Sequence, residues 1–393
     1  MGRARVLEEI RVMRFEELLE RHERGYLTQA EAAEMLGVSE RTFRRWQDRW
    51  RAEGAEGLRD RRVGKPSPRR AAAAEIAAML GLYRDHYEGF TVKHFHELAE
   101  TRHGYKLGYT VTRLALQQAG LVRPAARRGA HRRRGPGRRM AGMLLHQDGS
   151  RHLWLPGLDR QIDLVATMDD ATGELVSAFL VEEEGTASSL RGLAETIAAK
   201  GLFCALYTDR GGHYFHTSEA GRVDRQHPTQ VGRALAQLGI EHIAAYSPQA
   251  RGRSERLFRT LQDRLVKELA QAGITDDIEA ANRYIAEVYL PAHNARFAVR
   301  AELEGSAFVP VAPEQWREVL CRQESRQVGN DNCVRWRGRS LQIPPSPLRP
   351  HFVRAKVRLH EYSNGAVALF WGPHRLADFP PPGTAAETTK RAA

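Results

Sequence analysis

Apolar residues across residues 27–50 recur with helical spacing on both sides of one short turn. Thr28, with Glu31 three residues later, has the spacing of a capping box, so a helix is predicted to begin there. Gly37 predicts its end, and Ser39 is placed to cap a second helix. The positions predicted to face inward are Ala32, Ala33, Leu36, Val38, Phe43 and Trp46.

The second of these helices carries Arg and Gln on its polar face. A helix, a short Gly-containing turn and a basic helix is the layout of a helix-turn-helix, whose second helix enters the major groove of DNA. The alternative is a helical hairpin with a solvated basic face, but the turn spacing and the polar face together favour DNA. Residues 1–62 are therefore expected to bind DNA through Arg41, Thr42, Arg44, Arg45 and Gln47.

A second helical unit of similar kind is predicted over residues 71–122. Its last helix has the pattern of another recognition helix, with Arg113 and Gln117 exposed. The unit also contains four histidines whose spacing matches no zinc site, so surface or DNA-facing positions are expected for them. They are His86, His94, His96 and His103.

From residue 140 onward, strands alternate with helices. Strands are predicted over 143–155, over 161–181 as a pair joined at 170–173, over 202–209 and over 240–246. Helices are predicted over 186–200, over 229–239, after residue 254 and across 275–320. This order predicts a mixed α/β core over 140–320, with helices covering the faces of one sheet.

The C-terminal part, residues 327–379, is again rich in strands. Asn364-Gly365 between two alternating runs is a hairpin signal. We expect a small basic β-barrel here, followed by a disordered tail over 380–393.

Composition points to a polyanionic partner. The chain has 393 residues, a net charge of +12 and a pI near 9.9, and Arg supplies most of the positive charge. A GC-rich genome would explain the amount of Arg but not its clustering in residues 123–139, which hold eight arginines and no acid. This run predicts an extended arm that follows phosphates rather than a solvated spacer, with Arg132, Arg133 and Arg134 at its centre.

Cysteine usage and the N-terminus favour an intracellular protein. The three cysteines form no C-x-x-C pair, which argues against a disulfide framework or a zinc–thiolate site. No signal peptide or membrane span is recognisable, so a cytoplasmic location without membrane contact is expected.

Three acids lie at special places in the α/β layout. Asp148 is in the first strand, Asp209 ends a buried strand before Arg-Gly-Gly, and Glu255 opens the long helix. Each also has a routine explanation as a turn or helix-start residue. Three other acids near strands compete with Asp148, namely Asp163, Asp169 and Asp170, the last two fitting a hairpin turn better. Gathered carboxylates would suit Mg²⁺ or Mn²⁺, and two such ions support in-line displacement at phosphorus.

The segments HQDGS, LYTDRGGHY and LGIEHIAAYSPQARGRSERLFRTL resemble, in this order, the catalytic core of insertion-sequence transposases in the retroviral-integrase superfamily. The resemblance covers about residues 140–300. It implies an RNase H-like sheet in which Asp148, Asp209 and Glu255 are the catalytic triad and hold two Mg²⁺ or Mn²⁺ ions. The S-P-Q-x-x-G-x-x-E motif is the most specific part.

Two departures from the family pattern are present. The interval between Asp209 and Glu255, residues 210–254, is longer than usual, and the excess falls in 213–229. No cysteine precedes Cys204, so the zinc-binding domain of retroviral integrases is missing. Both departures suggest a divergent branch, such as the unclassified ISNCY type.

The resemblance implies a bacterial DNA transposase that binds terminal inverted repeats, cleaves at the 3′ ends and joins them to target DNA. Arg259 and Gln262, on the same helix side as Glu255, would grip DNA near the cleavage point. Paired ends imply a homodimer or a higher oligomer on DNA. The alternatives are a non-catalytic DNA-binding regulator on the same scaffold and a metal-dependent nuclease without strand transfer.

Overall fold

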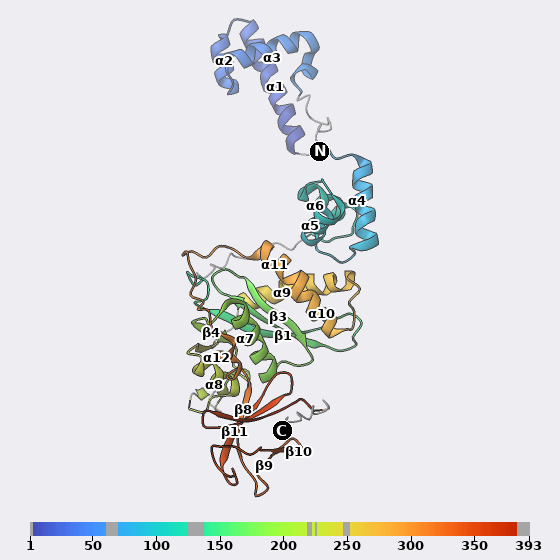
Figure 1. The fold of residues 1–393 in the computed structure, drawn as a ribbon. Coiled ribbons are helices and arrows are strands. Elements are labelled where there is room, and N and C mark those ends of the chain that lie inside the picture. The colour runs from blue at the N-terminus through green and yellow to red at the C-terminus, as the bar shows by residue number, and fades with distance from the viewer. Residues whose placement is uncertain are drawn as a thin grey trace. The chain divides into compact units, whose positions relative to one another are not determined.

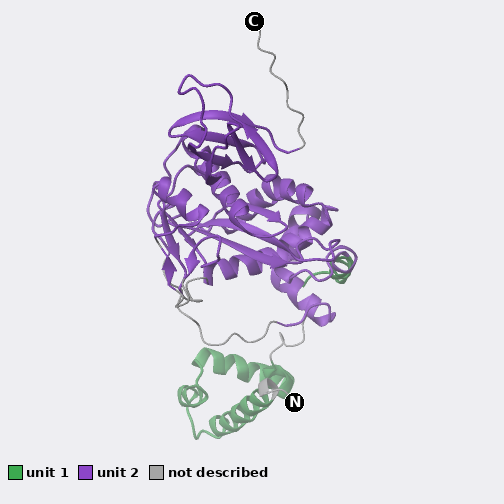
Figure 2. Cartoon of the chain, turned by 90° about the horizontal axis from the view of Figure 1, so that it is seen from below, with its two compact units in different colours: residues 1–81 green, residues 82–393 purple. Residues whose placement is uncertain are grey.

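The computed structural model describes residues 3–59, 70–124, 137–217, 222–224, 226–246 and 252–382. The chain divides into two compact units, residues 1–81 and 82–393, which are coloured separately in Figure 2. Within the described ranges, no helix combines the length and the apolar character needed to traverse a bilayer. Each unit is described by itself below.

The first unit contains the predicted pair of helices. Thr28 forms a complete capping box with Glu31, and Gly37 ends α2 with a left-handed φ of 71°. Ser39 caps α3, as predicted, by accepting a hydrogen bond from the Thr42 backbone N–H. The helical elements are α1 (Arg3–Glu23), α2 (Gln29–Leu36), α3 (Glu40–Glu53) and a 3₁₀ helix (Gly54–Leu58). The core they enclose contains Phe15, Leu19, Ala32, Ala33 and Phe43.

Helix α4 (Ala73–His86) crosses the boundary between the units, and α5 (Val92–His103) and α6 (Tyr109–Gln118) belong to the second unit. The rings of Tyr83 and Tyr87 pack against Phe95, and Tyr87 also packs against Phe90. The tight aromatic packing holds α5 against the end of α4. The helical pattern predicted for this part of the chain is confirmed.

The centre of the second unit is a five-stranded mixed sheet (Figure 1). Its strand order is β3-β2-β1-β4-β7, with β1, β2 and β3 antiparallel and β1, β4 and β7 parallel. The strands are β1 (Leu145–His152), β2 (Ile162–Asp169), β3 (Leu175–Val181), β4 (Ala205–Thr208) and β7 (Glu241–Ala244). The mixed α/β layout predicted from the pattern is therefore confirmed. The segment 213–229 carries the short pair β5 (His216–Thr217) and β6 (Val223–Asp224).

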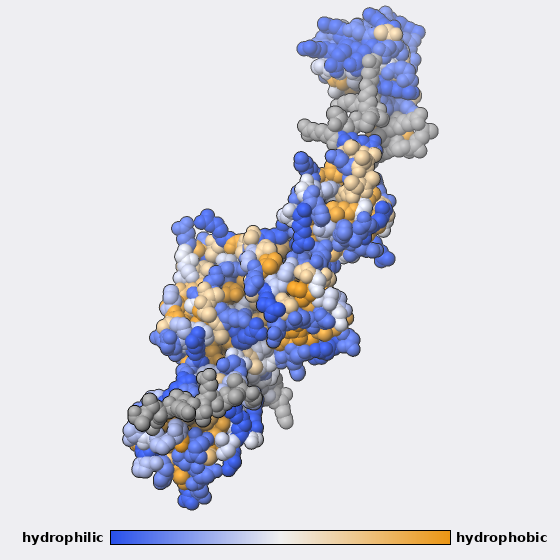
Figure 3. Space-filling model, turned by 45° about the vertical axis from the view of Figure 1, so that its right-hand side comes forward, coloured by the Kyte–Doolittle hydropathy of each residue, from blue (hydrophilic) through white to orange (hydrophobic). Residues whose placement is uncertain are grey.

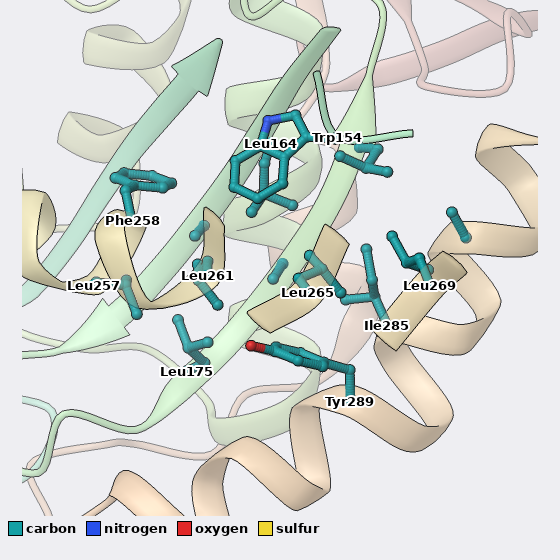
Figure 4. Close-up of a cluster of buried hydrophobic side chains, with 14 of the residues drawn as sticks. Trp154, Leu164, Leu175, Leu257, Phe258, Leu261, Leu265, Leu269, Ile285 and Tyr289 are labelled. Atoms are coloured by element: carbon teal, nitrogen blue, oxygen red, sulfur yellow. The ribbon is translucent and has the colours of Figure 1, made fainter. Parts of the chain in front are cut away.

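Helices cover both faces of this sheet. Leu145 and Leu206 pack with α7 (Thr186–Lys200) and α8 (Gln230–Gln237) on one face. On the other face, α9 (Gly252–Gln271) packs Leu257, Leu261 and Leu265 against β2 and β3, as Figure 4 shows. This apolar stripe has the spacing of an amphipathic helix. It fixes which side of α9 faces the sheet and which side remains polar.

Helices follow α9 only in part of the region where they were predicted. Residues 298–312 are not helical, because Leu202 and Val309 exchange backbone hydrogen bonds that hold this segment along the core. The helices are α10 (Ile278–Tyr284), a π turn (Ile285–Tyr289), α11 (Leu290–Phe297) and α12 (Pro313–Arg317).

Helix α5 docks onto α9 through buried polar side chains. The Glu97 carboxylate accepts from Arg264 at 2.8 Å and also contacts Arg296. His94, fully buried, lies 2.9 Å from Glu268. His96 is buried as well, with its Nε2 at 2.9 Å from the Leu107 carbonyl. The prediction that His94 and His96 lie at the surface is wrong, because packing against residues distant in the sequence covers both side chains.

The C-terminal strands form two antiparallel sheets. The orders are β13-β12-β11-β8 and β10-β9, and in the described part of the chain hydrogen bonds do not join them into the predicted barrel. The hairpin at Asn364-Gly365 is present, with Gly365 at a φ of 79°. The strands are β8 (Arg322–Gln327), β9 (Cys333–Trp336), β10 (Arg339–Gln342), β11 (Lys356–Glu361), β12 (Val367–Trp371) and β13 (His374–Phe379).

Candidate active site

Asp148 lies in the middle of β1, on the face of the sheet that α9 covers. It is paired with Ala166 across the antiparallel β1–β2 ladder. Residues paired in this way point to the same face, and Ala166 belongs to the core cluster of Leu257 and Leu261 from α9. Asp148 therefore points toward α9, with 9% of its surface exposed.

Asp209 follows β4, the parallel neighbour of β1. The register pairs His146 with Tyr207, so Asp148 and Asp209 lie at the same level two residues further along both strands. The Asp209 carboxylate accepts a hydrogen bond of 2.8 Å from the Gly211 backbone N–H, which holds the turn after the strand. The register thus brings the two aspartates side by side.

The hydroxyl of Tyr214 lies close to Glu184 and is influenced by the charges of two further carboxylates. Burial raises the pKa of Tyr214, and the negative charges of Glu184, Asp148 and Asp209 raise it further. The hydroxyl donates to Gln147 Oε1 at 3.1 Å and reaches Glu184 Oε1 at 3.4 Å. The Tyr214 hydroxyl therefore stays protonated and is a buried hydrogen-bond donor next to the strands that carry Asp148 and Asp209.

Glu184 is an acid of this site that carries no signal of its own in the sequence. Its backbone N–H donates to Asp163 Oδ2 at 2.8 Å, and its Oε1 lies 3.4 Å from His213 Nε2. The carboxylate lies directly against Gly149, where an added Cβ would be 2.0 Å from Glu184 Oε2. Glu184 ends a run of three glutamates that is typical of a solvated surface. The glycine directly after Asp148 was the one hint of a close approach.

Glu255 lies in the first turn of α9 with an exposed side chain. Residues 247–251, which lead into this helix and contain most of the S-P-Q-x-x-G motif, lie outside the described residues. Among the residues with described positions, no three His, Cys, Asp or Glu side chains are arranged to hold a metal ion. The approach of Glu255 to Asp148 and Asp209 therefore stays a prediction.

The other acids near the strands have separate contacts. Asp169 serves the hairpin turn, as expected, by accepting from the backbone N–H groups of Ala171 (3.0 Å) and Thr172 (2.9 Å). Asp163 holds the Glu184 backbone. Asp170 turns inward and is only 6% exposed.

Gln262 and Arg259 lie on the polar side of α9. Gln262 Nε2 donates to Ser150 Oγ in β1 at 3.1 Å, whereas Arg259 is exposed. They follow Glu255 by seven and four residues, so the three side chains lie on one side of the helix.

The basic face predicted for the first unit is present on α3, and the surface of this unit seen in Figure 3 is largely hydrophilic. Arg41, Arg44 and Arg45 are exposed, and Thr42 is half-buried beside Ser39. The prediction that Gln47 belongs to the exposed DNA-binding face is wrong. Gln47 is only 7% exposed, because it lies one helical turn beyond the buried Phe43 and points to the same side.

In the second unit, Arg113 and Gln117 of α6 are half-buried rather than fully exposed. Arg132, Arg133 and Arg134 of the basic arm lie outside the described residues. Their predicted contacts with DNA stay predictions.

Comparison with known proteins agrees with this layout. Residues 18–77 match the model of a winged helix-turn helix family. The chain is 31% identical over 358 residues to the putative transposase y4bF of Sinorhizobium fredii, covering 90% of this chain and 77% of that protein. It is 26% identical over 366 residues to the transposase for insertion sequence IS1202 of Streptococcus pneumoniae, covering 84% and 77%.

Two solved structures have a weaker likeness. The HTLV-2 integrase catalytic core domain in complex with magnesium matches 38% of this chain and 89% of that chain at 14% identity, with a TM-score of 0.28. A simian T-cell lymphotropic virus intasome in complex with PP2A regulatory subunit B56 gamma matches 72% of this chain and 91% of that chain at 17% identity, with a TM-score of 0.30.

Proposed function

Because this chain belongs to the transposase family, we propose that it cleaves DNA at the 3′ ends of its own element and joins them to target DNA. The observation that supports this chemistry best is the pairing of Asp148 and Asp209. They lie at the same level of adjacent parallel strands, beneath the helix that carries Glu255. Such a row of carboxylates suits phosphoryl transfer on DNA.

The donor set fits a hard divalent cation. Asp148, Asp209 and Glu255 offer carboxylate oxygens alone, which Mg²⁺ and Mn²⁺ prefer, and we propose that these three residues hold two ions. When bound, such ions supply charge neutralisation and activation of the attacking oxygen. Glu184 adds a further negative charge on the other face of β1, against Gly149.

The chemical steps are two displacements at phosphorus. Water attacks the phosphodiester at the element end, and the bond to the flanking DNA breaks, which leaves a 3′-OH on the element. This 3′-OH then attacks a target phosphodiester, forms the new P–O bond and releases a target 3′-OH. No covalent bond to the protein is formed. The acids hold the reacting groups in line, while Arg259 and Gln262 of α9 grip DNA beside the cleavage point.

The helical units and the basic arm would recognise the terminal inverted repeats. Exposed arginines of α3 suit the major groove, and α6 is the second candidate. The arm at 123–139 would follow the phosphates between these units and the core over 140–320. Two ends held together require two or more copies of the chain. The long interval before Glu255 favours a divergent branch such as the ISNCY type.

One assay tests this proposal against its alternatives. Labelled DNA from the element ends is incubated with a target plasmid, Mg²⁺ and either the full chain or its Asp209→Asn variant. Asp276→Asn, a change at an exposed acid, is the matched control. Joined products that disappear with Asp209→Asn and persist with Asp276→Asn support transposition. Cleavage without joining indicates a nuclease, and binding without chemistry in any of the proteins indicates a regulator.

A further inference from the structure

Asp170 is a buried acid that connects three separate segments of the core. Its Oδ1 lies 2.8 Å from His146 Nε2 in β1 and 3.0 Å from Arg253 Nε in α9. Its Oδ2 accepts from the Arg138 backbone N–H at 2.6 Å. Burial by itself would raise the pKa of Asp170, but these hydrogen bonds and the charge of Arg253 hold it below its usual value.

The contact with Arg253 is made by two groups of Asp170. Besides the carboxylate, the Asp170 carbonyl oxygen accepts from Arg253 Nη1 at 3.0 Å. The guanidinium also leaves little space beside Gly137, where an added Cβ would be 3.1 Å from Arg253 Nη2. A planar guanidinium fixed at two points has little freedom to turn. The first turn of α9 is thereby attached to the end of β2.

His146 and Tyr207 each precede one of the two proposed catalytic aspartates by two residues. In strands, residues two apart point to the same face. Arg253 precedes Glu255 by two residues in a helix, where such side chains point to different sides, so the contact of Arg253 with Asp170 acts on the first turn of α9 and not directly on the Glu255 side chain. The His146 and Tyr207 rings lie 5.2 Å apart edge to face, directly beside the pair of aspartates.

A second contact holds α9 on the other side of Asp148. Gln262, on the same side of α9 as Glu255, donates to Ser150 in β1. The Asp170 connection reaches β1 at position 146 and the Gln262 contact reaches it at position 150, so the two bracket Asp148. Two attachment points fix both the position of α9 along β1 and its rotation.

We propose that Asp170 is a positioning residue, which acts through Arg253 and His146 to hold Glu255 over Asp148. This inference rests on the proposed function, because it takes Glu255 as the third acid of the site. A role of Asp170 in the hairpin turn is not needed, since Asp169 already supplies the contacts of that turn. Burying a carboxylate costs free energy of folding unless the charge is paired. Asp170 is paired with Arg253, which belongs to the helix that carries Glu255.

The test compares metal binding by the full chain with Asp170→Asn, which keeps the shape and removes the charge. Mn²⁺ is titrated into the protein without DNA, and the binding constant is measured in the wild-type and Glu255→Gln backgrounds. Loss of a group that orients a metal ligand weakens metal affinity by about 10- to 100-fold. We expect a loss of that size in the wild-type background and almost none when Glu255 is already Gln.

Further variants separate this role from a purely structural one. Arg253→Gln should reproduce the loss and Arg253→Lys should restore part of it, while Asp159→Asn, at an exposed acid, should leave binding unchanged. An equal loss in both Glu255 backgrounds, or no loss in either, overturns the positioning role. If Asp148→Asn and Asp209→Asn leave Mn²⁺ binding and joining intact, the proposed function itself fails, whatever Asp170→Asn does.

Discussion

The two helical units have similar sequence patterns, but their polar residues have different surroundings. In the first unit, Arg44 and Arg45 of α3 are exposed. In the second, Glu97 and His94 of α5 are buried against α9, where they meet Arg264 and Glu268. A polar helix face is therefore open for the proposed contact with DNA in one unit and serves as a docking surface in the other.

The docking of α5 gives the second helical unit, residues 71–122, a direct connection to the proposed active site. Helix α9 carries Glu255 in its first turn and the α5 contacts further along. Because both lie on one helix, we expect a change in how α5 docks to shift the start of α9. The first unit has its own apolar core around Phe15 and Phe43, which favours a separable reading domain.

The largest effect is expected from removing Glu97. Glu97→Ala leaves Arg264, whose side chain is 11% exposed, without its carboxylate partner, and breaking such a buried pair costs about 3–5 kcal/mol. The midpoint of urea unfolding measures this loss. Glu100→Ala removes an acid of the same helix whose side chain is 52% exposed, and should cost less than about 1 kcal/mol. Equal small losses would show that α5 does not depend on this docking.

Acid should weaken the same interface through His293 of α11. Burial, and then the charge of Arg264, lower the pKa of His293 to about 4 from 6.5. Between these two values the unfolded chain binds a proton that the folded chain does not, so stability falls as the pH drops from 6.5 toward 4. The slope is about 1.4 kcal/mol per pH unit.

The measurement is the urea midpoint across this pH range, with His293→Leu for comparison. The variant lacks the titrating group, so its midpoint should fall less steeply with acid. If the urea midpoints of the wild type and His293→Leu fall equally with pH, another group causes the acid sensitivity.

The exposed arginines of α3 should affect DNA binding and not stability. Arg45→Ala is expected to weaken binding to the element end by about 1–3 kcal/mol if Arg45 reads a base, measured by fluorescence anisotropy at fixed salt. Arg24→Ala removes the same charge from the same unit but outside α3, and should weaken binding less. The urea midpoint should stay unchanged for Arg45→Ala. Equal losses of affinity would indicate general attraction to phosphates.

Local signals in the sequence predicted local structure well. The helix over 186–200 has the predicted bounds, and the caps at Thr28 and Ser39 are present, because they depend on residues within one turn. The strand order and the pairing of Asp148 with Asp209 depend instead on contacts between β1 and β4, which are far apart in the chain. Element type could therefore be predicted without a structure, whereas the two aspartates could be named from the sequence only as candidates.

Contacts between distant segments could not be predicted in this way. His94 has a polar neighbourhood in the sequence, and only the docking of α9, residues 252–271, buries it. Glu184 belongs to a run of three glutamates typical of a solvated surface, and only the fold of the chain after β3 places it against Gly149. Closure of the C-terminal strands into a barrel likewise depends on pairing between strands far apart in the chain. The alternation along each strand does not specify that pairing.

The smallest effect is expected at Thr28, and it bears on whether the first unit folds by itself. Thr28→Ala removes the side chain that accepts from the Glu31 backbone N–H, which costs about 1 kcal/mol. Thr28→Ser keeps the acceptor and should restore most of this loss. Hydrogen exchange should show faster opening of α2 and α3, with no change at β1 or α9. A rise in exchange that reaches the sheet would mean that the two units unfold together, and the contrast between a separable reading unit and a docked one would then be lost.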